Sequence, residues 1–129
     1  MRKEWIICGI VIICVLIVNI ITQKYTEKSI EIMDEKLEII KQSLSDEDIE
    51  YEKVKEQMNE AMYVWRERYE VLAYFIEHDE LEKVETELTS LDAHICTQEY
   101  KEGVTELEKS IFILNHIKDK SKLDIKNIF

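Results

Sequence analysis

Residues 5–21 read WIICGIVIICVLIVNII, a stretch without a charged side chain in which twelve of seventeen residues are Ile, Val or Leu. A helix from Trp5 to Tyr25 would be about 30 Å long, which matches the hydrocarbon thickness of a bilayer. Aliphatic side chains in this number favour insertion by about 4 to 7 kcal/mol. Trp5 and Tyr25 stand where interfacial aromatic residues belong, and Asn19 lies near the far end. This stretch predicts a transmembrane helix.

A cleavable signal peptide is the alternative, because two basic residues precede the apolar stretch. The stretch is longer than the usual apolar region of a signal peptide, and the sequence Thr-Gln-Lys-Tyr that follows Ile21 does not resemble a cleavage site. Each cysteine inside it follows an isoleucine, which does not suit lipoprotein processing. We therefore expect an uncleaved signal anchor, with residues 1–4 as a short tail and residues 5–21 as the span.

Basic residues flank this span on both sides: Arg2 and Lys3 precede it, and Lys24, Lys28 and Lys36 follow it. Their number alone does not favour a cytoplasmic N-terminus. The preceding tail is very short, however, and the flank that follows is rich in Glu and Asp. A single-span protein of this kind usually exports its long acidic domain. We expect a single-pass protein of the cell membrane with a cytoplasmic N-terminus and an extracytoplasmic helical domain.

The part of the chain after the span is strongly acidic. The formal net charge is −11, and because residues 1–4 contribute +1, the remainder carries −12. Such a domain is repelled by nucleic acid, which we exclude as a partner. About a hundred residues suffice for one small domain. Two of the three cysteines lie in the span, so no disulfide framework forms, and we expect Cys96 to be a small buried apolar residue.

The chain after the span contains no proline and a single glycine, and its apolar residues recur at alternating intervals of three and four. This spacing places them on one face of a helix. Four such stripes cover residues 30–44, 51–76, 81–95 and 100–114. Short interruptions between stripes imply antiparallel neighbours. We predict an all-α fold: an N-terminal transmembrane helix followed by an antiparallel helical bundle of about four helices. The bundle would occupy residues 22–117, and residues 118–129 would form a C-terminal tail that docks on it.

Two features of these helices can be predicted more closely. No helix-breaking residue separates the span from the first stripe, so we expect one helix to continue from the membrane to Leu44. Ser45, with Asp48 three residues later, fits the start of the second helix as an N-cap. A long coiled coil between chains is the alternative to a bundle, because the spacing is heptad-like. The polar corners between the stripes argue against it.

The titratable residues do not form a recognisable catalytic or metal site. None of the three histidines has the Glu-x-x-His spacing of a carboxylate-bridged metal site, and no phosphate-binding loop is present. We therefore expect no enzyme activity, no cofactor and no metal. The candidate contacts with a partner are Tyr74, which lies off the apolar stripe, the charged corner at Glu77 and His78, and the apolar end of the chain at Ile128 and Phe129. We expect this end to fold back onto the bundle, with docking on a partner as the alternative.

The block Phe75-Ile-Glu-His78-Asp-Glu and the closing Asn127-Ile-Phe129 resemble the bacterial family called domain of unknown function 4363. The resemblance covers essentially the whole chain. It implies a bacterial protein with one membrane span and a helical remainder. It implies no established activity and no catalytic residues. The corner at Glu77 and His78 and the end at Phe129 resemble features that the family shares.

Two functions are compatible with the sequence. We favour a non-enzymatic, membrane-anchored interaction or scaffold module of the bacterial cell envelope, with the lipid bilayer and another membrane or envelope protein as partners. A homo-oligomer is also compatible with this function. The alternative is an extracytoplasmic helical bundle that senses a ligand or a cation. It would signal through a membrane partner, because the four residues before Trp5 cannot supply a cytoplasmic output.

Overall fold

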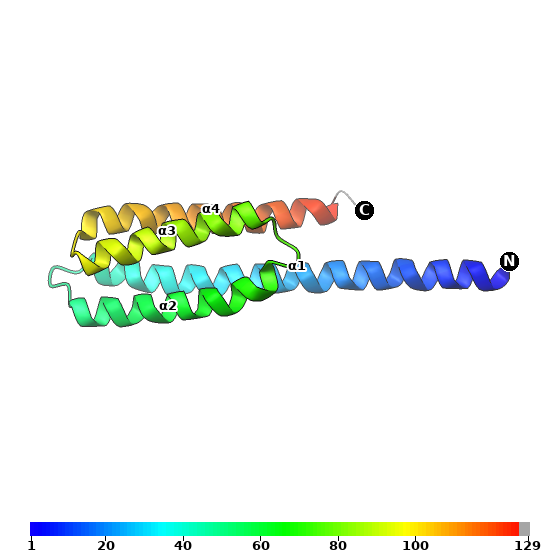
Figure 1. The fold of residues 1–129 in the computed structure, drawn as a ribbon, viewed down its shortest axis with the longest axis horizontal. Helices are drawn as coiled ribbons and strands as arrows, with labels where there is room; N and C mark the ends of the chain where they lie inside the picture. Colours follow the sequence, from blue (N-terminus) through cyan, green and yellow to red (C-terminus); the bar gives the residue numbers. More distant parts are fainter. Residues whose placement is uncertain (127–129) are drawn as a thin grey trace.

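The structure is a computed structural model that describes the backbone of residues 1–126 and the side chains of residues 1–123. Four helices follow one another along the chain (Figure 1): α1 Arg2–Leu44, α2 Tyr51–Leu72, α3 His78–Cys96 and α4 Tyr100–Lys126. The described residues form no strand. The predicted all-α fold with four helices is confirmed.

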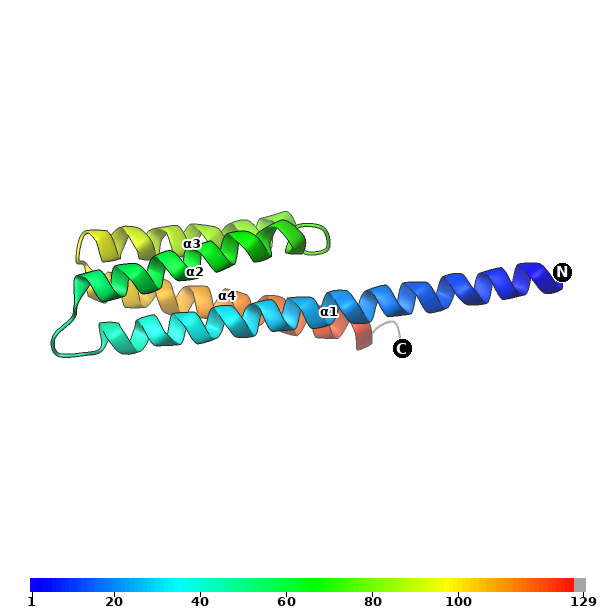
Figure 2. The ribbon, with the colours of Figure 1, turned by 90° about the horizontal axis from the view of Figure 1, so that it is seen from below.

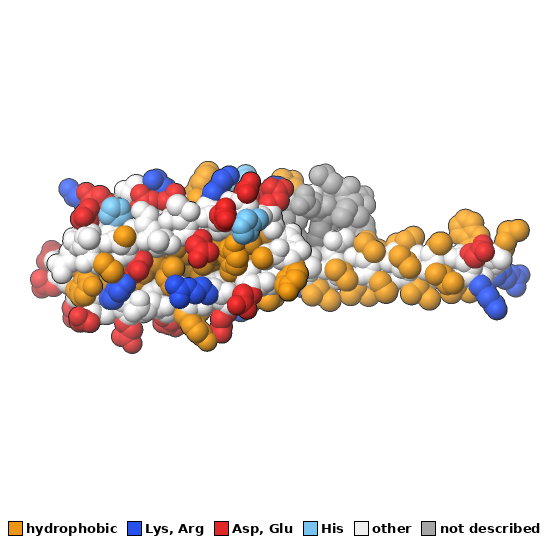
Figure 3. Space-filling view, viewed as in Figure 1, with side chains coloured by type: hydrophobic (Ala, Val, Ile, Leu, Met, Phe, Trp, Pro, Cys, Tyr) orange, Lys and Arg blue, Asp and Glu red, His pale blue; other side chains and the backbone are white. Residues whose placement is uncertain are grey.

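α1 is one continuous helix of 43 residues, and its length is about 65 Å. Its apolar segment, residues 5–21, projects beyond the other helices and shows apolar side chains along the face seen in Figure 3. α1 is long and apolar enough to cross a membrane, and its most apolar window contains no buried residue. From Thr26 onward one face of α1 is buried. The predicted continuity from the apolar segment to Leu44 is confirmed.

The rest of α1 forms a bundle with α2, α3 and α4, and the chain reverses direction at each corner (Figure 2). Within the described residues α1 contacts α2 and α4, and α3 contacts the same two helices. The buried stripe of each helix faces a common core, because the spacing of three and four keeps apolar residues on one face. Core residues without exposed surface include Met33, Leu37, Met58, Leu81, Leu88 and Leu107.

The register of α1 against α4 is marked by polar contacts at intervals of seven residues on both helices. Residues seven apart return to the same face of a helix after two turns. The contacts are Lys41 with Glu108, Asp34 with Asn115 (Oδ2 to Nδ2, 3.1 Å) and Glu27 with Lys122 (Oε1 to Nζ, 3.1 Å). The last contact places the end of α4 beside the part of α1 that follows the apolar segment.

The N-cap predicted at Ser45 is wrong, because Ser45 ends α1 instead of starting α2. Its backbone N–H and its hydroxyl both donate to the carbonyl oxygen of Lys41, at 3.0 and 2.9 Å. α2 begins at Tyr51 after Glu50, without a side-chain cap. A serine hydroxyl can bond to the carbonyl four residues before it as well as to a following N–H, so the sequence does not distinguish the two roles.

The predicted C-terminal tail is also wrong over the residues that the structure describes, because α4 continues to Lys126. Residues 118–126 are the last turns of this helix and not a linker followed by a docked tail. Their lysines form ion pairs with other helices: Lys120 with the start of α3, and Lys122 with α1. These distant partners explain why a polar run that resembles a linker remains helical.

Two smaller predictions fail at the ends of helices. α2 ends at Leu72, so Ile76 of the predicted stripe belongs to the corner between α2 and α3. Cys96, expected to be buried, is exposed. It follows the buried Ile95 directly, and consecutive residues of a helix point about 100° apart. The buried stripe of α3 therefore excludes Cys96.

Candidate functional site

The corner between α2 and α3, residues 73–77, lies against α1 just beyond the apolar segment. The Phe75 ring meets the Tyr25 ring edge to face, with centroids 6.2 Å apart. The guanidinium of Arg68 lies 5.1 Å from the centroid of the Tyr25 ring. Each such contact contributes roughly 0.5 to 1.5 kcal/mol. Tyr25, expected to be an interfacial anchor, therefore joins α1 to the corner.

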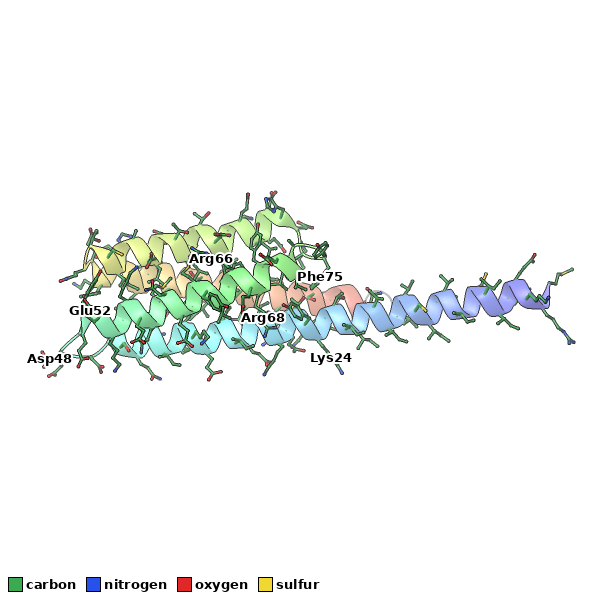
Figure 4. The ribbon with its side chains drawn as sticks, turned by 60° about the horizontal axis from the view of Figure 1, so that its bottom comes forward. Lys24, Asp48, Glu52, Arg66, Arg68 and Phe75 are labelled. Atoms are coloured by element: carbon green, nitrogen blue, oxygen red, sulfur yellow. The ribbon has the colours of Figure 1, made fainter. Side chains whose placement is uncertain are left out.

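Figure 4 shows where this cluster lies along the molecule. Arg68 and Phe75 lie at the end of the packed helices from which the apolar segment projects, and Lys24 marks the same end on α1. Asp48 and Glu52 lie at the opposite end. The site is therefore next to the apolar segment, and the acidic first corner is far from it.

The corner is also joined to the end of α4 by an ion-pair cluster. Lys120 Nζ donates to Glu77 Oε1 at 3.2 Å and to Glu80 Oε1 at 3.1 Å. The hydrogen bonds to Glu80 and Glu77 raise the pKa of Lys120 above its ordinary value, so the side chain stays charged at neutral pH. One lysine faces two carboxylates, and the cluster has a formal charge of −1.

His78, at the start of α3, lies between a hydroxyl and a carboxylate. Its Nδ1 is 3.2 Å from the Tyr69 hydroxyl and its Nε2 is 2.8 Å from Glu82 Oε1. This order resembles the hydroxyl, imidazole and carboxylate of a nucleophile relay. Burial, together with the nearby Glu85 and Glu82, raises the pKa of Tyr69. A raised pKa disfavours the phenolate, and the chain of contacts joins the end of α2 to the start of α3.

A pocket of about 210 Å³ lies between α1, this corner and the end of α4. Asn19, Thr22 and Gln23 form its α1 side. Thr22 and Gln23 come three and four residues after Asn19, so all three side chains lie on the same side of the helix. The same face continues into the buried residues of α1 that begin at Thr26. The other lining residues are Phe75, Ile76, Glu77, Glu80, Ile117, Lys120 and Ser121.

The sequence model of the family described as domain of unknown function (DUF4363) matches residues 20–128. The chain belongs to the DUF4363 family. The resemblance predicted from the corner and the end of the chain is confirmed. The match includes the corner, the ion-pair cluster and nearly all of the pocket, whereas most of the apolar segment precedes it. No curated protein and no solved structure is significantly similar to the chain.

The sequence block that carried the DUF4363 resemblance has a structural explanation. Phe75 packs on α1, Glu77 and Glu80 bind Lys120 of α4, and His78 contacts Tyr69 of α2. One short block thus joins the corner to three helices. A role of this kind in packing explains the block whether or not the corner also binds a partner.

The predicted contact residues separate into three groups. Tyr74 is 89% exposed at the corner, whereas Glu77 and His78 are exposed but take part in the contacts described above. Ile128 and Phe129 lie outside the described residues. Sequence reasoning missed Lys120, which is 43 residues from Glu77 in the chain and carries no local signal.

Asn19, unlike Lys120, could have been recognised from the sequence. Its spacing to Thr22 and Gln23 continues the alternation of three and four that defines the buried stripe of α1. That pattern predicts an inward-facing side chain within the apolar segment. In the part of the chain that the structure describes, no group of three or more His, Cys, Asp or Glu side chains is placed to hold a metal ion.

Proposed function

We propose that this DUF4363 protein is a non-enzymatic interaction or scaffold module of the bacterial cell envelope. It is a single-pass antiparallel four-helix bundle whose first helix is also its membrane anchor. The observation that carries the proposal is the division of α1. None of its residues 5–21 is buried, and Asn19 is the one clearly polar side chain among them, whereas one face of the helix from Thr26 onward belongs to the core.

The energetics of α1 favour this arrangement. An uncovered apolar rod in water is unfavourable by roughly 25 cal/mol for each Å² of apolar surface, and a bilayer removes that surface from water. The bundle cannot cover it, because α1 extends beyond α2, α3 and α4 (Figure 1). The contacts of the corner and of α4 with α1 then hold the bundle close to the membrane surface.

The proposed orientation is a cytoplasmic N-terminus and an extracytoplasmic bundle. Arg2 and Lys3 stand directly before the apolar segment, and the residues after the segment carry a formal net charge of −12. Basic residues are retained in the cytoplasm more strongly than acidic ones. Lys24 and Lys28 follow the segment and oppose this preference, so the orientation rests on the contrast between the basic residues before the segment and the acidic bundle after it.

The contacts at the corner support a structural role over a catalytic one. The contact between Tyr69 and His78 joins α2 to α3, and Phe75 and Glu77 join the corner to α1 and α4. Tyr74 is an exposed aromatic residue of the corner itself, and aromatic residues are enriched among binding hot spots. We propose that Tyr74, Glu77 and His78, together with the end of the chain, contact another envelope protein.

Crosslinking in the native membrane, followed by identification of the captured protein, tests this function. We expect a specific envelope partner, with less captured when residues 123–129 are deleted and the bundle remains folded. We expect Tyr74→Ala to reduce the amount captured. The control is Tyr63→Ala, because Tyr63 is 62% exposed within α2 and lies outside the corner. Recovery of only uncrosslinked monomer from native membranes contradicts the interaction module.

The pocket beside the apolar segment favours one alternative, a sensor that signals through a membrane partner. Binding of a ligand or a cation to the folded state must raise the melting temperature. A thermal-shift series with divalent cations separates the two functions. A cation-dependent rise that is lost in Glu77→Gln supports sensing, and unchanged melting supports the scaffold.

A further inference from the structure

The pocket lies at a defined height relative to the apolar segment. Its residues Asn19, Thr22 and Gln23 overlap the end of that segment and the first turn beyond it. If α1 crosses a bilayer, the charged Glu77, Glu80 and Lys120 of the pocket stay outside the hydrocarbon. The hydrocarbon then ends with the apolar segment, and these residues lie at the level of the phospholipid head groups. This placement rests on the proposed function. At this height the molecules next to the protein are lipids.

The pocket offers groups of three kinds to a ligand. Glu77 and Glu80 each bind Lys120 through Oε1, and no hydrogen bond within the described residues reaches their Oε2 atoms. Lys120 provides a fixed positive charge. Asn19 and Gln23 provide side-chain amides on the α1 side. The pocket can therefore receive a cationic donor and an anionic acceptor at the same time.

The ratio of charges favours a ligand that carries an ammonium group. Two carboxylates and one lysine give the pocket a formal charge of −1. An ammonium group offsets this charge, whereas a purely anionic ligand makes the pocket more negative. A primary ammonium has three N–H donors for the free carboxylate oxygens. A phosphate next to that ammonium can accept from Lys120 and from the amides, and bonds between charged groups are stronger than neutral ones.

We infer that this pocket binds the phosphoethanolamine head group of a membrane lipid, with the ammonium at Glu77 and Glu80 and the phosphate near Lys120. The head group has both required charges in adjacent positions. A choline head group has no N–H donor on its ammonium. A glycerol head group has no positive charge. The pocket thus discriminates among lipids through hydrogen bonds to the ammonium.

The test uses the full chain in a mild detergent, with Trp65 fluorescence as the signal of unfolding. Trp65 is 1% exposed in the core, whereas Trp5 is 77% exposed in the apolar segment, so the change in tryptophan emission on heating reports the loss of the bundle. Phosphatidylethanolamine, phosphatidylcholine and phosphatidylglycerol are titrated separately, and the rise in melting temperature gives the apparent affinity. We expect phosphatidylethanolamine to bind about tenfold or more tightly than the other two, because it alone satisfies both carboxylates.

Free phosphoethanolamine in the same assay distinguishes a soluble ligand from a lipid. The lipid inference predicts a much smaller rise for the free head group than for the lipid at equal concentration. An equal rise for both overturns the assignment to lipid. Equal rises for all three lipids overturn the inference as a whole, because they show binding by acyl chains or by detergent exchange.

The substitution Glu80→Gln keeps the shape of the side chain and removes its charge. We expect it to reduce the preference for phosphatidylethanolamine over phosphatidylcholine to about twofold or less. The matched control is Glu108→Gln, which also removes a glutamate from an ion pair with a lysine, but on the side of α4 that faces Lys41. The control should keep the full preference.

Retention of the lipid preference in Glu80→Gln and in Lys120→Gln overturns the pocket as its origin. The melting temperature of each variant without lipid shows that it is folded. Failure of the membrane anchor itself is detected separately, by extraction of the protein from native membranes at alkaline pH. An extractable protein contradicts the proposed function, whereas an anchored protein without a lipid preference contradicts only this inference.

Discussion

Gly103 lies in the first turn of α4, where that helix approaches α3, and the approach does not require a glycine. A Cβ atom at this position would lie 3.6 Å from Leu91 Cδ1 and 3.7 Å from His94 Cβ, which are ordinary van der Waals distances. Glycine is destabilising within a helix by roughly 0.5 to 1 kcal/mol relative to alanine. We expect Gly103→Ala to raise the melting temperature by roughly 2 to 8 °C.

Thermal unfolding followed by circular dichroism measures this effect. The larger Gly103→Val serves as a comparison, because its two methyl groups must displace neighbours in a close-packed interior. We expect Gly103→Val to be less stable than Gly103→Ala. A lower melting temperature for Gly103→Ala than for the natural chain would show that α3 and α4 are closer than the structure has them.

Asp34 makes stability depend on pH. Burial raises its pKa above the ordinary value of 3.8, although the hydrogen bond from Asn115 opposes the rise. Its Oδ1 is buried without a partner among the described residues. A raised folded-state pKa gives stability that is complete below the ordinary carboxyl pKa and is lost as the pH rises through the raised value. At neutral pH the ionised Asp34 therefore destabilises the fold.

We expect Asp34→Asn to melt several degrees higher than the natural chain at neutral pH, because the amide carries no charge to desolvate. The difference should shrink as the pH falls below the raised pKa, where Asp34 is protonated. Melting curves over a series of pH values measure it, with the exposed Glu31→Gln on the same helix as control. A difference that is constant with pH would show that the hydrogen bond, and not the charge, is responsible.

At the scale of elements, α1 couples the apolar segment to the pocket through a continuous helix. An alanine inserted between Gln23 and Lys24 rotates the residues before it by about 100° and shifts them by about 1.5 Å. Asn19, Thr22 and Gln23 then turn away from the corner, while the buried residues from Thr26 onward stay in place. We expect the melting temperature without lipid to change little and the preference for phosphatidylethanolamine to disappear.

The control is an alanine inserted between Glu4 and Trp5, which lengthens α1 before the apolar segment and leaves the pocket intact. The lipid titration is repeated for both variants. If the insertion after Gln23 keeps the full preference, the α1 side of the pocket does not contribute to binding. The same result would also show that the two parts of α1 turn independently.

The elements illustrate what a sequence can and cannot predict. The apolar spacing located the cores of all four helices, because burial of a stripe depends on local periodicity. Their ends were less predictable: Ser45 closes one helix instead of opening the next, and α4 runs through a lysine-rich stretch to Lys126. Those ends depend on partners such as Glu27 and Glu77, which lie far away in the chain.

The candidate site was predictable only in part for the same reason. The corner at Glu77 and His78 stands out as a charged interruption between two stripes. Its ion pair with Lys120 and its contact with Tyr25 through Phe75 exist only after the four helices pack. The polar face at Asn19 could have been predicted, since it continues the periodicity of the α1 stripe.

At the scale of the whole molecule, the native cysteines report both anchoring and orientation. Cys96 is exposed at the end of α3, whereas Cys8 and Cys14 lie in the apolar segment. Thiols react with maleimide as thiolates, which a hydrocarbon environment suppresses. A maleimide that cannot cross membranes therefore distinguishes a thiol in outside water from one in the bilayer or in the cytoplasm.

The most direct measurement is the labelling of spheroplasts with such a maleimide, followed by mass analysis of the purified chain. An anchored protein with an extracytoplasmic bundle predicts a single label, at Cys96, and three labels after unfolding in detergent. Cys96→Ser should remove the label from spheroplasts. Labelling of Cys96 only after lysis would contradict the orientation, and labelling of Cys8 or Cys14 in intact membranes would contradict the membrane span itself.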